Sequence, residues 1–141
     1  MNFGEREVKM RIMFDTNILL SAIAFKSTMM AKIIKNVQME HEILLCQYVI
    51  GEFEDVADKK MPKQSAALKK VLSDLPYTKV KSAVWQPCMG DLRDEKDKPI
   101  LAAAILADAD MIITGDKDFL ESGITHPQII SHLDFLRDYM D

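Results

Sequence analysis

Short apolar runs and helical patterns alternate along the chain. Residues 10–14 are apolar and rich in β-formers, the polar residues 15–17 follow, and residues 18–23 continue in an apolar pattern compatible with a helix. This order predicts a strand, a carboxylate at the end of that strand and the start of a helix. A second helix is predicted after a cap at Ser27 or Thr28, because apolar side chains recur there at helical spacing, at Met29, Ile33, Ile34 and Val37.

The same order returns in the middle of the chain. Residues 42–46 form a candidate buried strand. The apolar face of the helix that follows consists of Val49, Phe53, Val56 and Ala57. Pro62 ends this helix, residues 66–75 predict another that stops at Pro76, and residues 78–81 predict a weak strand. Residues 82–93 show no clear period and predict a loop.

The last third of the chain has the clearest pattern. Pro99 stands near the first turn of a run of helix formers, where its missing N–H costs nothing, so residues 100–107 predict a helix. The remaining predicted elements are a buried strand over 111–114, a turn over 115–118, a strand over 129–130 and a closing helix over 132–139.

Regular alternation of strands and helices predicts a parallel sheet, because parallel neighbours need crossover connections and helices provide them. We therefore expect an α/β fold, a three-layer α/β/α sandwich with a central parallel sheet. A chain of 141 residues, 48% of them hydrophobic, suffices for one core. We expect a single domain over residues 1–141, with residues 1–9 as a loose N-terminal extension.

Charge and cysteine content narrow the function classes. A net charge of -4 argues against a protein that coats nucleic acid with dense Lys/Arg surfaces, although it leaves a nuclease with a carboxylate site open. No apolar run approaches the roughly 20 residues that span a bilayer, and the N-terminus lacks the order of a signal peptide, so we expect a cytoplasmic protein. Cys46 and Cys88 show no CxxC spacing, which favours free thiols.

Two acids stand at predicted strand ends. Ligands of an open parallel sheet bind beyond the carboxyl ends of its strands, so Asp15 and Asp116 are expected in one crevice. Asp97, at a helix N-terminus, is placed to join them, and Glu52 can reach in from the side. Converging carboxylates repel one another unless a hard divalent cation with oxygen ligands lies between them. A divalent-metal site is therefore predicted.

Each acid also has an ordinary structural explanation. Asp15 and Asp97 are equally compatible with helix N-caps, and Asp116 with a turn residue, since Gly and Asp dominate turns. A single glutamate such as Glu52 on a solvated helix face does not by itself indicate a functional site. The coincidence of acids at strand ends favours the metal site. We assign no catalytic role to the isolated histidines His41, His126 and His132.

Four segments together resemble a known family. They are FDTNIL at 14–19, the later Glu52, RDEKDKPIL at 93–101 and ITGDKDF at 113–119. This combination resembles PIN-domain ribonucleases, in particular the VapC-like proteins, which are toxin components of toxin–antitoxin systems. The resemblance runs from about residue 10 to the C-terminus.

The resemblance implies an endoribonuclease that depends on Mg²⁺ or Mn²⁺. Its four catalytic acids would be Asp15, Glu52, Asp97 and Asp116, with Asp15, Asp97 and Asp116 as the metal ligands. Supporting roles would fall to Thr16, Asn17, Asp94, Thr114 and Asp118. The bound metal would activate water for in-line attack on the phosphodiester. The resemblance also implies an RNA substrate, an antitoxin partner and a homodimer.

The third acid has two candidates. Family members often carry it immediately before the helix that begins here at Pro99, but this chain has Lys98 at that place. Asp97 and Asp94 therefore remain, and Asp97 is favoured.

Three other functions are compatible with an acid after the first strand to different degrees. A haloacid-dehalogenase-like phosphatase needs a second Asp two residues after the first, where Asn17 stands. A receiver domain needs an acidic pair before its phospho-acceptor strand and a Lys after its last strand, and neither is evident. A PIN fold that has lost its metal and only holds a partner remains the main alternative.

Overall fold

The computed structural model describes residues 9–90 and 92–140. The predicted N-terminal extension falls, apart from Lys9, outside these residues. Five strands form one parallel sheet in the order β3-β2-β1-β4-β5. The strands are β1 (Arg11–Phe14), β2 (Glu42–Cys46), β3 (Thr78–Val80), β4 (Met111–Thr114) and β5 (Gln128–Ser131). Each of them lies at or within two residues of its predicted position.

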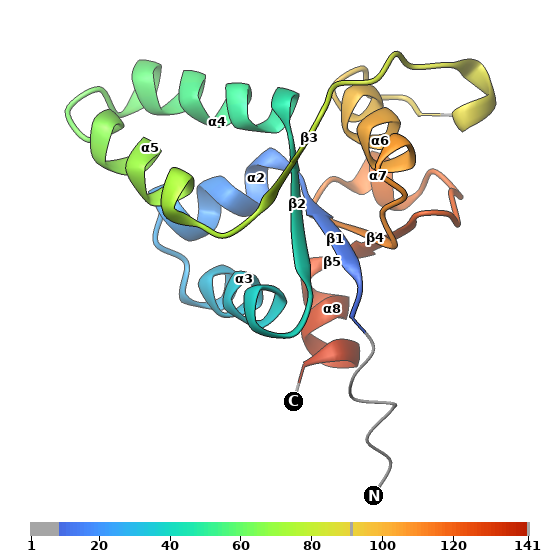
Figure 1. Cartoon of the computed structure of the whole chain (residues 1–141), viewed down its shortest axis with the longest axis horizontal. Coiled ribbons are helices and arrows are strands. Elements are labelled where there is room, and N and C mark those ends of the chain that lie inside the picture. The colour runs from blue at the N-terminus through green and yellow to red at the C-terminus, as the bar shows by residue number, and fades with distance from the viewer. Residues whose placement is uncertain (1–8, 91, 141) are drawn as a thin grey trace, which may run out of the picture.

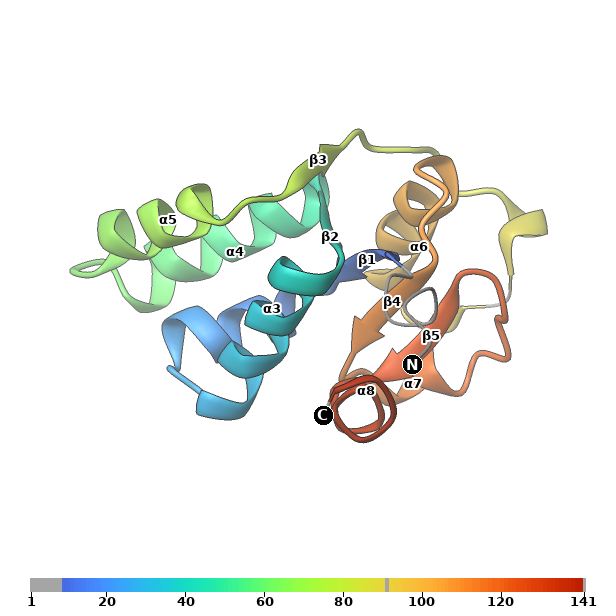
Figure 2. The same ribbon diagram turned by 60° about the horizontal axis from the view of Figure 1, so that its bottom comes forward.

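Helices cover the two faces of the sheet (Figures 1 and 2). One face carries α2 (Thr16–Leu19), the π-helical turn η1 (Leu20–Ala24), α3 (Thr28–Glu40), α4 (Gln47–Lys60) and α5 (Ser65–Asp74). The other carries α6 (Asp97–Leu106) and α7 (Lys117–Leu120), and α8 (His132–Tyr139) packs against α3. The predicted three-layer α/β/α fold is confirmed.

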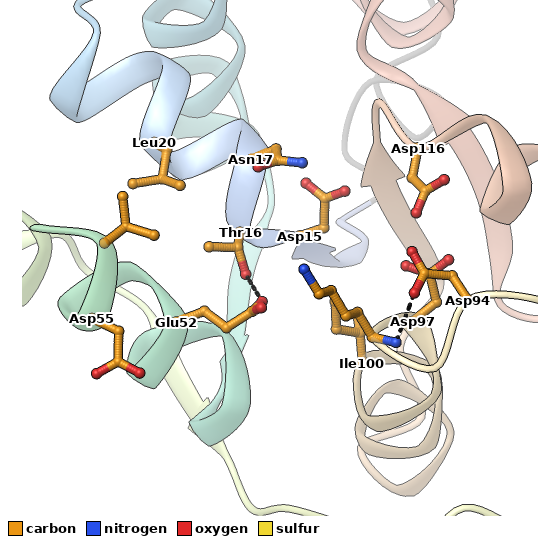
Figure 3. Close-up of a pocket in the computed structure, with 12 residues that line it drawn as sticks. Asp15, Thr16, Asn17, Leu20, Glu52, Asp55, Asp94, Asp97, Ile100 and Asp116 are labelled. Carbon is orange, nitrogen blue, oxygen red and sulfur yellow. Dashed lines mark hydrogen bonds between the residues drawn. The ribbon is translucent and has the colours of Figure 1, made fainter. Parts of the chain in front are cut away.

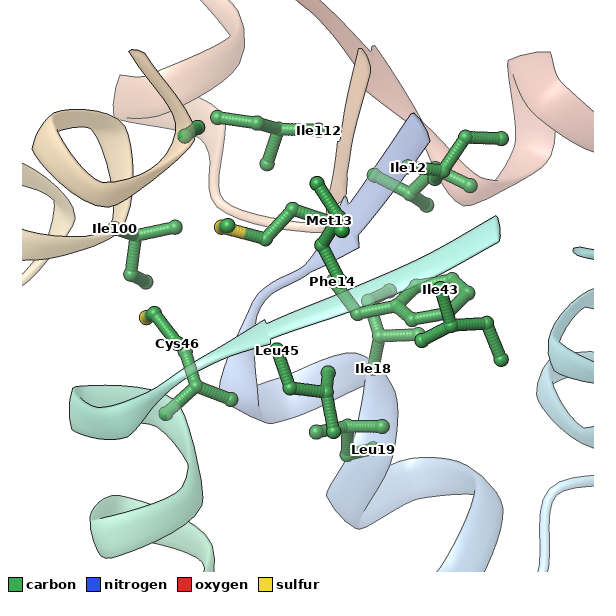
Figure 4. Packing of buried hydrophobic residues seen from close by; sticks show 14 of the residues in the cluster. Ile12, Met13, Phe14, Ile18, Leu19, Ile43, Leu45, Cys46, Ile100 and Ile112 are labelled. Carbon is green, nitrogen blue, oxygen red and sulfur yellow. The ribbon is translucent and has the colours of Figure 1, made fainter. Parts of the chain in front are cut away.

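The core lies between the sheet and its helices, and β1 crosses its centre. Ile12, Met13 and Phe14 are fully buried, as are Ile112 and Ile113 of the neighbouring strand β4. Figure 4 shows Ile12, Met13, Phe14 and Ile112 within this cluster. Burying a side chain of this size stabilises the fold by about 1.5–3 kcal/mol. The acid that follows β1 is therefore attached to one of the best-anchored strands in the molecule.

Local signals explain where most helices begin. The Ser27 hydroxyl accepts a hydrogen bond from the Met30 amide at 3.3 Å, so Ser27, rather than Thr28, caps α3. In the predicted loop over 82–93, the described residues form one short 3₁₀ turn, η2 (Pro87–Met89). The predicted turn over 115–118 is wrong in one respect: Lys117 begins the short helix α7, because the Asp116 side chain accepts from the Asp118 amide and caps it.

Among the described residues, no single helix is long and apolar enough to span a membrane. One bent pair, Thr16–Ala24 with Thr28–Glu40, has sufficient length and composition, but its two parts meet at 114°.

Candidate metal centre

A cleft of about 350 Å³ opens at the carboxyl edge of the sheet. The strand order reverses beside β1, since the chain adds β2 and β3 on one side and β4 and β5 on the other. A crevice forms at such a point because the two connections leave the sheet in opposite directions. Six carboxylates line it: Asp15, Glu52, Asp55, Asp94, Asp97 and Asp116 (Figure 3).

Asp15 lies at the bottom of the cleft and has two structural partners. Its Oδ1 accepts from the Ile18 amide at 3.1 Å, which caps α2, and its Oδ2 accepts from the Thr114 hydroxyl. Only 5% of the residue is exposed. Burial raises the pKa of Asp15, and the two hydrogen bonds oppose that rise. Asp15 is therefore both the N-cap of α2 and a residue of the cleft.

Thr114 joins Asp15 to Asp116. Its fully buried hydroxyl donates to Asp15 and accepts from the Asp116 amide at 3.0 Å. Because this one side chain contacts both acids, the ends of β1 and β4 are held in a fixed relation.

Three acids converge on the other wall of the cleft. One carboxylate oxygen from each of Asp94, Asp97 and Asp116 lies within 4.8 Å of the other two. Asp97 is only 4% exposed, and its Oδ2 has no hydrogen-bond partner among the described residues. Burial, then the neighbouring Asp116 side chain and the charges of Asp94 and Asp15, raise the pKa of Asp97 to about 8.

This donor set fits a hard divalent cation. A buried oxygen without a partner is costly, and carboxylates this close favour holding a proton over ionisation. Mg²⁺ and Mn²⁺ are bound by oxygen ligands, and one such ion would both partner the Asp97 oxygen and offset the repulsion.

Glu52 lies across the cleft, on α4. One of its oxygens accepts from the Thr16 hydroxyl at 2.5 Å (Figure 3). The other accepts from the Tyr48 hydroxyl at 3.2 Å. Burial and the Glu52 charge raise the pKa of Tyr48 to about 12, so the phenol stays a donor. Glu52 is thus held apart from the three converging acids.

Several site predictions need adjustment. Asp97 is not a cap: Lys96 occupies the N-cap position of α6 and Asp97 its first turn. Asp94 and Asp97, the two candidates for the third acid, both converge with Asp116. Asp118 does not line the cleft, and its carboxylate pairs with Arg93 at 3.7 Å.

Other placements follow the sequence analysis. Asn17 lines the cleft beside Thr16. No histidine among residues 9–90 and 92–140 lines it. Cys46 is buried and Cys88 exposed, and both thiols are free.

Three residues of the site were not predicted from the sequence. Asp55 and Lys96 line the cleft, and Tyr48 holds Glu52. Tyr48 stands four residues before Glu52, a helical spacing that was available in the sequence as a signal. Nothing in the sequence singled out Asp55 or Lys96.

Comparison with known proteins gives a family and a fold. A family model described as PIN domain matches residues 11–118. The structure is similar to a chain in the crystal structure of VapBC2 from Rickettsia felis bound to a DNA fragment from their promoter. The TM-score is 0.65 at 16% identity, covering 86% of this chain and 97% of that one. No curated protein matches the sequence.

Proposed function

Because the chain belongs to the PIN-domain family, we propose that it is a divalent-metal-dependent endoribonuclease, the toxin of a toxin–antitoxin pair. Asp94, Asp97 and Asp116 converge in the cleft, with Asp15 lining it as well, and a buried oxygen of Asp97 has no hydrogen-bond partner among the described residues; this is the observation that carries the proposal. This arrangement destabilises the metal-free protein, and a cation-binding role explains why the chain contains it.

The residues on the two walls of the cleft have different proposed roles. Asp94, Asp97 and Asp116, together with Asp15, would hold Mg²⁺ or Mn²⁺, and Thr114 keeps Asp15 and Asp116 in register. The ion supplies activation of the attacking water and neutralisation of phosphate charge. Glu52, fixed by Thr16 and Tyr48, faces this group across the space available to substrate and is placed to orient water or a second ion.

Proton handling in the cleft centres on Asp97. Its raised pKa means that the carboxyl keeps its proton to a higher pH than an ordinary aspartate does, and the proton must leave before the oxygen can bind a cation. Metal affinity should therefore rise with pH until this group is ionised.

The partners proposed are RNA, an antitoxin protein and a second copy of this chain. Similarity to a chain of VapBC2 supports the antitoxin as part of this proposal. An RNA substrate and an antitoxin place the protein in the cytoplasm.

Cleavage of RNA tests the proposal directly. Purified protein is incubated with a labelled single-stranded RNA pool and Mg²⁺ or Mn²⁺, with EDTA and the Asp116→Asn variant as controls. We expect cleavage by the wild type that both controls abolish. Cleavage that survives both would come from a contaminating nuclease and would contradict the assignment. A wild type that binds no metal would favour the PIN-fold interaction module instead.

A further inference from the structure

One positively charged side chain, that of Lys96, lines the cleft together with the six carboxylates. Of the cleft-lining residues that the structure describes, Lys96 alone carries a positive charge. A phosphodiester that enters this cleft is repelled by every ionised carboxylate that a metal does not neutralise. A single ammonium group therefore has a large share of the attraction that the protein itself offers to the substrate.

Lys96 stands between two of the converging acids on a fixed backbone. Its amide donates to Asp94 Oδ1 at 3.0 Å, and the Asp97 amide donates to the Asp94 carbonyl at 3.1 Å. The ammonium group makes no ion pair within residues 9–90 and 92–140.

Helix stability does not explain a lysine here. Lys96 is the N-cap of α6, a position that favours Ser, Thr, Asp or Asn, and its side chain makes no capping bond. The N-terminal end of a helix dipole also disfavours a cation, by about 0.3–1 kcal/mol. The position costs stability, and an anionic ligand would compensate for it.

Lys98 offers a contrast two residues along. Its Nζ pairs with Glu95 at 2.8 Å and lies 5.8 Å from the centre of the Trp85 ring, and it does not line the cleft. Of these two lysines, Lys98 has an ion-pair partner, whereas the Lys96 ammonium group has none among the described residues.

We propose that Lys96 binds the phosphodiester of the RNA substrate through its ammonium group, beside the acids that hold the metal. This inference rests on the proposed nuclease function and adds a substrate-binding residue to it. In this arrangement the acids bind the metal ion, and Lys96 binds the phosphate group of the RNA.

Steady-state cleavage kinetics test this role. We compare wild type with Lys96→Gln, Lys96→Arg and, as the matched control, Lys98→Gln, at saturating Mn²⁺. A lost hydrogen bond to a charged group should lower kcat/KM of Lys96→Gln about ten- to a hundredfold, mainly through KM. Lys96→Arg should retain most of the activity, and Lys98→Gln should match wild type. The dependence of kcat/KM on NaCl should also weaken in Lys96→Gln, because one phosphate contact is lost.

Mn²⁺ titration separates substrate binding from metal binding. Lys96→Gln should bind Mn²⁺ at least as tightly as wild type, since a nearby positive charge has been removed. Wild-type cleavage that Lys96→Gln leaves unchanged would overturn the inference, as would a variant that cleaves faster because its metal binds more tightly. Failure of the nuclease proposal looks different: the wild type itself then neither cleaves the RNA nor binds it in a fluorescence anisotropy assay.

Discussion

At the scale of one residue, Asp97 destabilises the metal-free fold and contributes an oxygen to the proposed metal site. It is buried, one of its oxygens has no partner among the described residues, and its neighbours are acids. A residue selected for stability alone would be apolar at such a place. The metal-free protein should therefore be more stable without this carboxylate than with it.

The free energy of unfolding should reveal this through pH. The pKa of Asp97 is about 8 in the folded chain and near 3.8 when unfolded, so between these values the folded state binds more protons. The Asp97 contribution to stability must then fall as pH rises through this window. We expect urea unfolding in EDTA to show Asp97→Asn more stable than wild type, with a difference that grows by about 1.4 kcal/mol or more between pH 5 and pH 8.5. A difference independent of pH would contradict the raised pKa.

Asp116 should separate activity from stability. Asp116→Asn removes a metal ligand and a repulsive charge together, and the Asn side chain can still cap α7. We expect an unchanged or raised melting temperature and a loss of RNA cleavage of about a hundredfold or more, since 2.7 kcal/mol of transition-state stabilisation corresponds to that factor. Normal cleavage by this variant would remove Asp116 from the site, whereas a lower melting temperature would show that its charge is needed for folding.

At the scale of elements, α4 positions Glu52 by supplying its own partner one turn earlier. Tyr48 and Glu52 share a face of α4, and Thr16 from α2 holds the other oxygen of the same carboxylate. Two donors from two helices restrict the rotation of the Glu52 carboxylate. Its position is therefore a property of the α2–α4 contact.

The Tyr48 hydroxyl should influence catalysis more than stability. Tyr48→Phe removes one hydrogen bond and keeps the ring, so unfolding should become easier by only about 0.5–1.5 kcal/mol. We expect slower RNA cleavage with a loss smaller than that of Glu52→Gln, because Thr16 still holds the carboxylate. Tyr139→Phe is the matched control, since it removes a hydroxyl that bonds Gln128 at 3.3 Å, at the start of β5. Equal cleavage rates for both Phe variants would contradict the positioning role.

At the scale of the whole molecule, the parallel sheet assembles a site from residues far apart in the sequence. Thr114 and Asp15, 99 residues apart, share a hydrogen bond because β1 and β4 are neighbours. Metal binding should therefore require the folded chain and stabilise it as a whole.

Thermal unfolding measures this coupling. A cation that binds only the native state at a hundred times its Kd adds about 2.7 kcal/mol to the free energy of unfolding, so Mn²⁺ should raise the melting temperature of the wild type. Asp94→Asn should show a smaller rise, because Asp94 converges with Asp97 and Asp116. Asp118→Asn should keep the full rise, since that carboxylate pairs with Arg93 outside the cleft. Equal shifts in both variants would exclude Asp94 as a ligand.

The sequence by itself determined the strands, the longer helices and the edge at which the acids gather. Apolar spacing, the caps and the prolines are local signals, and they placed all five strands and the closing helix. The position of Asp15 and Asp116 after two strands was enough to predict one crevice, because parallel strands end at the same edge.

Only the tertiary structure decided which side chains meet there. Asp94 and Lys96 reach the cleft just before α6, and the preceding sequence over 82–93 has no periodic pattern from which their position could be inferred. Asp118 stands two residues after Asp116 and yet lies outside the cleft, because the first turn of α7 directs it toward Arg93. Periodicity determines which face of an element is buried, whereas contacts between side chains depend on how loops and helices from distant parts of the sequence pack together.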